Sequence, residues 1–443
     1  MRSLLIVEDD PIVRKIYQSK FVNEGFTVRV AVDGQEAVEA LKASRPDIVL
    51  LDLMLPKVDG LDVLKLVRSQ PSTSTVPVIV FSNAYANQLI QEAWDAGATK
   101  CLTKVDCTPR QVIEVIHKAL EEAASPPKPA PVAAAPVPPP PDLTELESAS
   151  GAPAADMPAA PARPKRAAAP VAAPAAIVPA NPAPQMTPAQ MLESEIAFQE
   201  ELKRSFLKSA PELLNGIRSM FQGFVKAEVE AKQQMLADLV TSLRSLTSNA
   251  AVSGCQRFAQ MASAVEALVR ELYEKPKNIN QSTIRTIALA LHTLQTLVPA
   301  EEEPPPPDAM APVVLVVDDE VISRRTVAQA LQKARLRAIT VDAPGDALKL
   351  VQENKFDLIF LDVDMPGMNG FDLCAKIRAV PTNKATPVVF VTNLNDFNHR
   401  TKSAQSGGND LIGKPFMLIE LAVKALTYLM QLPPAKPIAP KPA

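Results

Sequence analysis

Short, uniformly apolar runs alternate with amphipathic segments at both ends of the chain. Each run is apolar at every position, and the clearest are 4–7, 48–51, 78–81, 313–317, 358–361 and 388–391. Such runs are typical of strands buried on both faces. Segments between them, such as 35–43 with Ala37, Val38 and Leu41, place apolar side chains on one helical face. Five strand–helix units in about 120 residues predict an α/β fold, a doubly wound parallel five-stranded sheet, at each end.

The stretch between these two end blocks has a helical period instead. Apolar side chains recur every three or four residues within 236–246, 258–272 and 284–294. Two further helices are expected at 190–208 and 211–230. Four or five amphipathic helices joined by short loops predict a central all-α helical bundle.

Proline and alanine mark the boundaries between the blocks. The chain has 443 residues and 43 prolines, of which 19 lie between Pro126 and Pro188 in an alanine-rich background. Such a stretch cannot bury a core and favours extended conformations. We therefore expect folded blocks at 1–122, 189–299 and 312–432, linkers at 123–188 and 300–311, and a disordered tail at 433–443.

Charge and composition exclude several classes of protein. The 46 basic and 49 acidic residues give a net charge of −3, and 189–300 carries 12 basic against 11 acidic residues, which argues against nucleic acid as a partner. No apolar run approaches the roughly 18–20 residues of a membrane span. The opening apolar run meets Glu8 too early for a signal peptide. Four scattered cysteines and three histidines argue against a disulfide scaffold or a zinc protein, so we expect a cytoplasmic location.

The two end blocks are copies of one internal repeat. Laid over each other at an offset of 310 residues, they align without a gap. The matched pairs are Asp9 with Asp319, Asp52 with Asp362, Pro56 with Pro366, Gly60 with Gly370, Ser82 with Thr392, and Lys104 with Lys414. So many polar residues at one offset indicate that both copies keep the same chemistry.

Acidic, hydroxyl and ammonium groups stand where the apolar runs stop. They are Glu8, Asp9, Asp52, Ser82 and Lys104 in the first block, and Asp318, Asp319, Asp362, Thr392 and Lys414 in the second. Because the carboxyl ends of parallel strands meet at one edge of a sheet, we expect one pocket in each block. Clustered carboxylates raise each other's pKa, and Mg²⁺, which prefers oxygen ligands, relieves the repulsion. A cation, a lysine and a hydroxyl beside a carboxylate suit the transfer of a phosphoryl group.

On these residues, both end blocks resemble receiver domains of two-component response regulators, which have a flavodoxin-like fold. The resemblance implies that Asp52 and Asp362 are phosphoacceptors. It implies that the acidic pairs Glu8/Asp9 and Asp318/Asp319 hold Mg²⁺ together with the acceptor carboxylates. It assigns phosphoryl binding and switching to Ser82, Lys104, Thr392 and Lys414.

The same resemblance implies the function and the partners. Phosphoryl groups would come from a histidine kinase or a phosphotransfer protein and would be read by a downstream signalling protein. The chain would not be an enzyme beyond intrinsic autophosphorylation and dephosphorylation. Asp362-Val363-Asp364 also matches the DxD motif of haloacid-dehalogenase-type phosphotransferases, but the first block has Met54 at the position of Asp364, and the remaining pattern fits receivers better.

Both blocks depart from the usual receiver pattern. Cys101 and Leu411 replace the tyrosine or phenylalanine that receivers usually carry three residues before the lysine. Lys104 is followed by Val105, whereas Lys414 is followed by the usual proline, Pro415. The acceptor residues are complete in both blocks, but the standard readout face is not, and the first block departs further.

Residues 244–254 of the bundle resemble the active helix of histidine phosphotransfer domains, whose pattern is approximately His-x-Leu-Lys-Gly-Ser-Ala. The match places Arg244 at the histidine position, Thr247 at the lysine and Ser248 at the first glycine. Arginine cannot form the phosphoramidate because its guanidinium stays protonated. The resemblance therefore implies a degenerate phosphotransfer domain that docks receivers without relaying phosphate.

Three alternatives for the bundle stay open. It is an unrelated helical bundle that forms a homodimer, or a relay that passes phosphate between the receivers through His292, or a transcriptional output. A basic recognition helix would favour the last, and the even charge argues against it.

Overall fold

The computed structural model describes residues 2–82, 87–124, 188–300, 311–393, 402–403 and 405–431. The expected linkers at 123–188 and 300–311 and the tail at 433–443 lie outside the described residues except at their edges. Met1–Ala124 and Glu195–Ala443 belong to one compact unit, called the first unit. The two end blocks and most of the bundle belong to the first unit.

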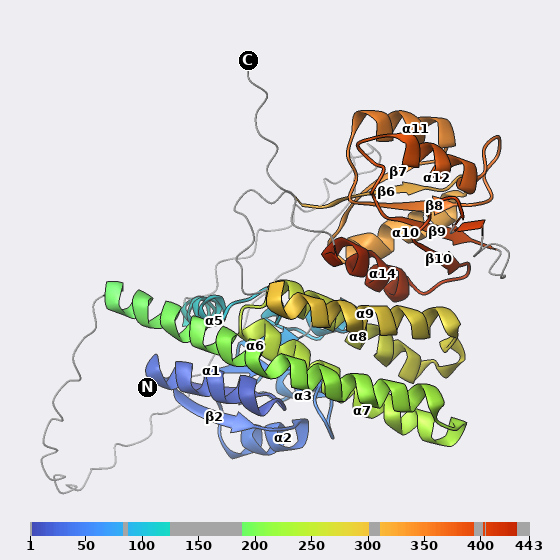
Figure 1. Cartoon of the computed structure of the whole chain (residues 1–443). Helices are drawn as coiled ribbons and strands as arrows, with labels where there is room; N and C mark the ends of the chain where they lie inside the picture. Colours follow the sequence, from blue (N-terminus) through green and yellow to red (C-terminus); the bar gives the residue numbers. More distant parts are fainter. Residues whose placement is uncertain are drawn as a thin grey trace, which may run out of the picture. The chain divides into compact units, whose positions relative to one another are not determined.

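The first end block is a five-stranded parallel sheet with helices on both faces (Figure 1). Its strands are β1 (Ser3–Val7), β2 (Thr27–Ala31), β3 (Ile48–Leu51), β4 (Val78–Ser82) and β5 (Lys100–Thr103), in the order β2-β1-β3-β4-β5. Its helices are α1 (Pro11–Asn23), α2 (Gly34–Ala43), α3 (Gly60–Ser69), α4 (Asn87–Asp95) and α5 (Pro109–Ala124). Apolar side chains of α1 and α5 form the core on one face, and those of α2, α3 and α4 form the core on the other.

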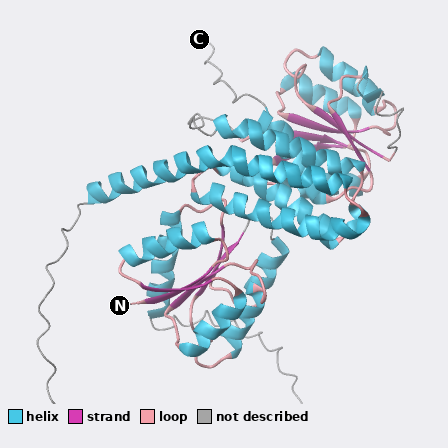
Figure 2. Ribbon diagram, turned by 60° about the horizontal axis from the view of Figure 1, so that its bottom comes forward, coloured by secondary structure: helices cyan, strands magenta, loops and turns pink. Residues whose placement is uncertain are grey.

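The second end block repeats this topology. Its strands are β6 (Val313–Val317), β7 (Arg337–Val341), β8 (Leu358–Asp362), β9 (Val388–Thr392) and β10 (Asp410–Gly413), in the order β7-β6-β8-β9-β10. Helices α10 (Val321–Lys333) and α14 (Leu418–Gln431) cover one face, and α11 (Pro344–Glu353) and α12 (Gly370–Ala379) cover the other. The strands appear in magenta between helices in Figure 2. The predicted fold class, a doubly wound parallel sheet at each end, is confirmed.

The central block is helical, as predicted. It consists of α6 (Pro188–Lys226), α7 (Val229–Val252), α8 (Gln256–Glu274) and α9 (Gln281–Ala300), with a short 3₁₀ turn at Pro276–Asn278. The expected pair of helices at 190–208 and 211–230 is wrong, because α6 continues through Pro211. Proline removes one backbone donor from a helix. Pro211 is exposed, so its ring lies on the solvent-facing side of α6.

The core of the bundle continues into the second end block. Ala422, Val423 and Leu426 of α14 belong to the same buried cluster as Leu291 and Leu294 of α9. Polar contacts accompany this packing. The buried carboxylate of Glu420 in α14 accepts hydrogen bonds from the hydroxyls of Ser282 and Thr286 at 2.5 and 3.2 Å. The second block is thus fixed to the bundle through α14.

Candidate functional site

The strand register brings the acidic residues of the first block together. Val7 at the end of β1 is paired with Leu51 at the end of β3, and the amide of Asp52 donates to the carbonyl of Val7 at 3.0 Å. Glu8 and Asp9 follow β1 directly. One carboxylate oxygen of each of Glu8, Asp9 and Asp52 lies within 4.8 Å of the others. These three carboxylates form the first acid cluster.

A buried lysine and a buried hydroxyl complete the first pocket. The ammonium of Lys104 donates to Asp52 Oδ2 at 2.6 Å and to Glu8 Oε1 at 2.9 Å, and its side chain is 1% exposed. Ser82 ends β4 and is fully buried, and its carbonyl accepts a hydrogen bond from the amide of Lys104 at 2.8 Å. Because β4 and β5 are paired through Ser82 and Thr103, the hydroxyl and the lysine stand side by side at the sheet edge.

Burial dominates the electrostatics of the first pocket. It raises the pKa of Glu8 to about 8, with the charge of Asp52 adding to the effect and Lys104 opposing it. It also raises the pKa of Asp9, again with a contribution from Asp52. Burial disfavours the charged form of Lys104, but the carboxylates of Asp52 and Glu8 outweigh it and raise the lysine pKa. The pocket therefore holds a cation among carboxylates whose repulsion the lysine only partly relieves.

The second pocket repeats the arrangement but is more exposed. Asp318, Asp319 and Asp362 form the second acid cluster, with one oxygen of each within 4.8 Å of the others. The ammonium of Lys414 lies 3.1 Å from Asp318 Oδ2 and 3.2 Å from Asp362 Oδ2, and its side chain is 10% exposed. Thr392 is fully buried, and its carbonyl accepts from the amide of Lys414 at 2.7 Å. Burial raises the pKa of Asp362, Asp318 adds to this, and Lys414 lowers it.

A glycine allows the chain to pass close to each acceptor-position aspartate. A Cβ placed on Gly60 would lie 2.1 Å from the carbonyl oxygen of Asp52, and one on Gly370 would lie 2.1 Å from that of Asp362. The amides of both glycines donate to the residue after the aspartate, at 3.0 Å to Leu53 and 2.9 Å to Val363. Any larger side chain would displace the backbone that carries the aspartate.

The donor atoms of both acid clusters suit Mg²⁺. Mg²⁺ takes oxygen ligands, keeps several waters, and is usually bound through one or two carboxylates. Each cluster offers three carboxylate oxygens within 4.8 Å of one another. In the first cluster, burial and mutual repulsion raise the pKa of Glu8 and Asp9, and a divalent cation would relieve that repulsion. The acidic residues therefore fit the ion, which Glu8, Asp9 and Asp52 would hold in one block and Asp318, Asp319 and Asp362 in the other.

Comparison with known families agrees with this geometry. The family model for the response regulator receiver domain matches residues 4–117 and again residues 314–426, together more than half of the chain. The chain belongs to the response regulator receiver domain family. Its two matched ranges are the two end blocks, here called the first and second receivers, and they flank the helical bundle. Receiver domains signal through phosphoaspartate and are not enzymes.

The curated relatives share the receiver but not the whole chain. The transcriptional regulatory protein CseB of Streptomyces avermitilis is 39% identical over 101 residues, which is 23% of this chain and 42% of that protein. The DNA-binding dual master transcriptional regulator RpaA of Synechocystis sp. is 35% identical over 104 residues, 24% of this chain and 43% of its own. The chain thus spans about two fifths of the length of these relatives. Among solved structures, the Vibrio cholerae chemotaxis protein CheY4 is 30% identical, with a TM-score of 0.26, over 27% of this chain and 99% of that one.

The structure gives Val105, which follows the lysine in the first receiver, a packing role. Val105 is buried and belongs to the core cluster of the bundle. The second receiver has Pro415 at the same position, after a cis peptide bond. Cys101 and Leu411, at the usual aromatic positions, are half-buried and buried, and burial raises the pKa of the Cys101 thiol to about 11. The residue after the lysine thus joins the first receiver to the bundle.

Helix α7 brings two further residues to the first acid cluster. The guanidinium of Arg244 donates to the carbonyl of Met54 at 3.1 Å and lies 3.9 Å from Asp9 Oδ2. The hydroxyl of Ser245 donates to Asp10 Oδ2 at 2.9 Å. Asp10 also caps α1, where its other oxygen accepts from two backbone amides. The sequence analysis singled out Arg244 because it occupies the histidine position of a phosphotransfer-like motif. It did not predict a role for Ser245 or Asp10.

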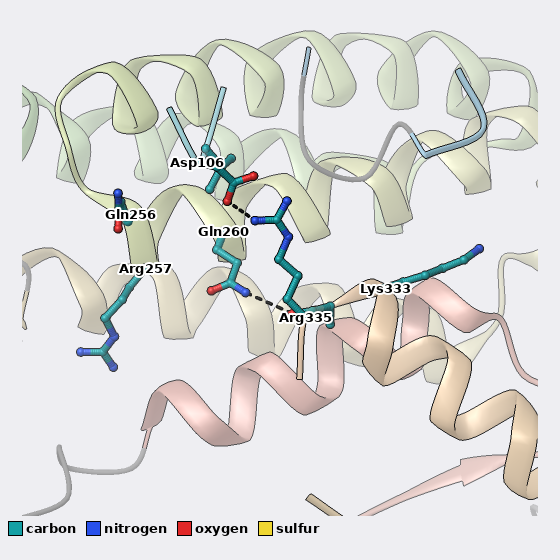
Figure 3. Close-up of a pocket in the computed structure, with 8 residues that line it drawn as sticks. Asp106, Gln256, Arg257, Gln260, Lys333 and Arg335 are labelled. Carbon is teal, nitrogen blue, oxygen red and sulfur yellow. Dashed lines mark hydrogen bonds and ion pairs between the residues drawn. The ribbon is translucent and has the colours of Figure 1, made fainter. Parts of the chain in front are cut away.

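A separate cavity lies where the first receiver, the bundle and the second receiver meet. It has a volume of about 350 Å³, and Figure 3 shows side chains that line it. Arg335, two residues after the end of α10, forms an ion pair with Asp106, which lies two residues after Lys104. Gln260 of α8 donates to the carbonyl of Ala334 at 3.2 Å. Arg257 and Lys333 point away from Arg335, so the cavity is lined by cations that do not converge.

Two other sequence predictions concern the helices. His292 is exposed on α9, and its neighbour Thr293 is buried. In the part of the chain that the structure describes, no helix is long and apolar enough to cross a membrane.

Proposed function

We propose that the protein is a phosphorelay signalling protein whose two receivers accept phosphoryl groups on Asp52 and Asp362. The observation that carries the proposal is the duplicated pocket. In each receiver a lysine ammonium contacts the acceptor aspartate and an acidic neighbour at the end of the first strand, at 2.6 and 2.9 Å in one and 3.2 and 3.1 Å in the other. A buried hydroxyl, Ser82 or Thr392, stands beside each lysine.

The residues divide the chemistry between them. A carboxylate oxygen of Asp52 or Asp362 attacks the phosphorus of a phosphohistidine, and a P–O bond forms as the P–N bond breaks. The leaving imidazole takes the electron pair of that bond and a proton. Lys104 or Lys414 pairs with the oxygens of the transferred group, and Ser82 or Thr392 donates a hydrogen bond to it. The acid clusters would hold Mg²⁺, which would further neutralise the phosphoryl charge.

We propose that the bundle is a degenerate phosphotransfer-like domain that binds a receiver without relaying phosphate. Arg244, at the position of the phosphotransfer histidine, lies beside the first acid cluster, which supports docking of this helix to a receiver. The guanidinium cannot carry phosphate under physiological conditions. The donor would therefore be a separate histidine kinase or phosphotransfer protein.

Output through protein contacts is the proposal that the bundle supports best. CseB and RpaA are named as transcriptional or DNA-binding regulators, but the match covers only about two fifths of each. The bundle carries nearly equal numbers of basic and acidic residues, which does not favour nucleic acid as a partner.

We propose a cytoplasmic location, because the kinases that serve receivers present phosphohistidine there. We propose that the folded domains are residues 1–122, 189–299 and 312–432. Measurement of the molecular mass in solution tests whether the bundle forms a homodimer.

Mapping the phosphorylated residues tests the acceptor assignment. The full chain is incubated with acetyl phosphate and Mg²⁺, and aspartyl phosphate is located by intact mass and peptide mapping. We expect two labels in the unchanged protein, one in Asp52→Ala, one in Asp362→Ala and none in the double variant. Asp364→Ala is the matched control: Asp364 is exposed two residues after Asp362, and its removal should leave both labels. It would abolish labelling at Asp362 if a DxD phosphotransferase mechanism operated.

The same experiment covers the relay alternative. Label that survives the double aspartate change and is lost in His292→Ala would overturn the proposal in favour of a histidine-bearing bundle.

A further inference from the structure

Helix α7 covers the first acid cluster with two polar side chains. Arg244 and Ser245 are adjacent in sequence, and each contacts a different part of the pocket rim. Arg244 reaches the carbonyl of Met54 at 3.1 Å and Asp9 at 3.9 Å, and Ser245 reaches Asp10 at 2.9 Å. Met54 lies two residues after Asp52, and Asp9 shares the first acid cluster with Asp52, so the guanidinium lies beside the proposed acceptor. The Arg244 side chain is 19% exposed.

Buried charges in α8 hold Arg244 in this place. The side chain of Glu266 is 1% exposed, and its Oε1 lies 3.8 Å from Arg244 Nε and 3.7 Å from Arg270 Nη1. Arg270 in turn contacts the sulfur of Met54 at 3.2 Å. A carboxylate buried between two guanidiniums restrains both of them, because moving either would leave a buried charge less well paired. The bundle therefore presents a pre-positioned cation to the first receiver.

Apolar packing extends the contact well beyond these polar groups. Val252, at the end of α7, is buried in the same cluster as Ile16 and Phe21 of α1. Phe198 of α6 packs against that cluster, and the ammonium of Lys20 lies 4.6 Å from the centre of its ring. The cover is thus part of a packed interface between the bundle and the first receiver.

The second receiver differs at the matching positions. Asp319 is exposed, whereas its counterpart Asp9 is half-buried. Glu320 is exposed, whereas its counterpart Asp10 is buried. The first pocket is therefore the more enclosed of the two, and Arg244 and Ser245 of α7 lie against its rim.

We propose that Arg244 and Ser245 form an internal cover over the first acceptor site, so that Asp52 accepts a phosphoryl group only when α7 moves away. The inference rests on the proposed acceptor role of Asp52. The guanidinium acts as a counter-ion to Asp9, so it opposes Mg²⁺ through like-charge repulsion at the same carboxylates. The helix also blocks the path along which a donor histidine must approach Asp52. The second receiver, whose acid cluster is more exposed, accepts phosphate first.

Labelling rates of the two aspartates in one molecule test this cover. The full chain is treated with acetyl phosphate and Mg²⁺, and the phosphorylated fractions of Asp52 and Asp362 are followed by peptide mapping over time. In the unchanged protein we expect Asp362 to be labelled faster. In Arg244→Ala with Ser245→Ala, we expect the rate at Asp52 to rise roughly tenfold, within the usual range for coupling between two sites, and that at Asp362 to stay unchanged.

Arg257→Ala is the matched control, because it removes a positive charge from the bundle at a residue that lines the cavity of Figure 3. It should leave both rates unchanged. An unchanged rate at Asp52 in the double variant would overturn the cover, and so would a lower rate, which would mean that Arg244 assists the phosphoryl group. Failure of both aspartates to label in any variant would instead refute the proposed function.

Hydrogen exchange gives a second measurement that needs no substitution. Backbone amides within 241–249 should exchange faster when Mg²⁺ and beryllofluoride are added to the unchanged protein, because loading of the first site displaces α7. A stretch in the middle of α9, 286–292, should be unaffected. Slower or unchanged exchange over 241–249, with beryllofluoride bound at Asp52, would contradict the proposal even if the double variant failed to fold.

Discussion

The ammonium of Lys104 lies 2.6 Å from the carboxylate of Asp52, and both side chains are at most 2% exposed. The matching pair in the second receiver, Lys414 and Asp362, is 3.2 Å apart, and the lysine side chain is 10% exposed. Loss of one partner of a buried charge pair strongly destabilises the folded protein, because the other charge remains buried without a counter-charge. The two receivers should therefore respond differently to loss of the lysine.

We expect Lys104→Met to lower the stability of the first receiver by about 3 kcal/mol at pH 7. Trp94, the only tryptophan of the chain, lies in α4 of that receiver, so its emission during urea unfolding reports on the relevant part. Lys414→Met is the matched variant and should leave the Trp94 transition nearly unchanged. Equal effects of the two substitutions on this transition would show that burial of Lys104 is not the cause of the lost stability.

The affinity of the first acid cluster for Mg²⁺ should rise with pH. Burial raises the pKa of Glu8 to about 8, so this carboxyl is mostly protonated below that pH and must lose its proton to bind the ion. We expect the affinity to increase by up to about tenfold per pH unit from pH 6 to 8 and to level off above pH 8. Titration calorimetry in an Asp318→Asn background, with the second cluster weakened, would measure it. Glu8→Gln should bind more weakly and lose this pH dependence, and a flat profile in the unchanged Glu8 chain would contradict the prediction.

Gly370→Ala should disturb the second acceptor site. The new Cβ would lie 2.1 Å from the carbonyl oxygen of Asp362, so the backbone that carries the carboxylate must shift. We expect destabilisation of about 1–3 kcal/mol, the usual cost of overpacking, and slower labelling of Asp362 by acetyl phosphate. Gly345→Ala, in α11 of the same receiver, has open space around its Cβ and should be neutral or slightly stabilising. Similar losses in both variants would show that the close approach is not the cause.

Removal of the Glu420 carboxylate should loosen the second receiver from the bundle. Glu420 is 3% exposed and accepts hydrogen bonds from Ser282 and Thr286 of α9. Hydrogen bonds to a charged group each contribute about 1.5–3 kcal/mol, so Glu420→Ala should lower the melting temperature and speed proteolysis between α9 and α14. Glu353→Ala, at an exposed position in α11, is the control. Unchanged proteolysis would show that the apolar packing alone holds α14 in place.

The sequence predicted both sheets and their acid clusters because these depend on local patterns. Each apolar run is a strand, and the reactive residues end the strands or come directly after them, so parallel topology alone brings Asp9 and Asp52 together. The repeat at a constant offset removed the ambiguity of reading either copy alone. The predicted interruption near Pro211 was wrong because an exposed proline can be accommodated within a helix whose apolar face is buried.

The cover over the first acid cluster was not predictable from the same patterns. It depends on contacts between Arg244 and Met54, which are 190 residues apart, and periodicity does not show which helix meets which pocket. One signal was present. Glu266 lies between Val265 and Leu268 in an otherwise apolar stripe, and a charge there indicates a buried partner. A buried Glu266 indicates an ion pair within the bundle, but it does not show that this part of the bundle contacts the first receiver.

The burial of α14 bears on how the second receiver can be studied. Leu421, Val423 and Leu426 of this helix are at most 2% exposed, and they pack on opposite sides, toward the receiver's own sheet and toward the bundle. A fragment that begins near residue 312, and so contains the second receiver without the bundle, would expose the apolar side chains of α14 that face the bundle. Bare apolar surface of this kind promotes self-association. If such a fragment forms dimers, the cause would be the removal of the bundle, and the dimers would not indicate the oligomeric state of the intact chain.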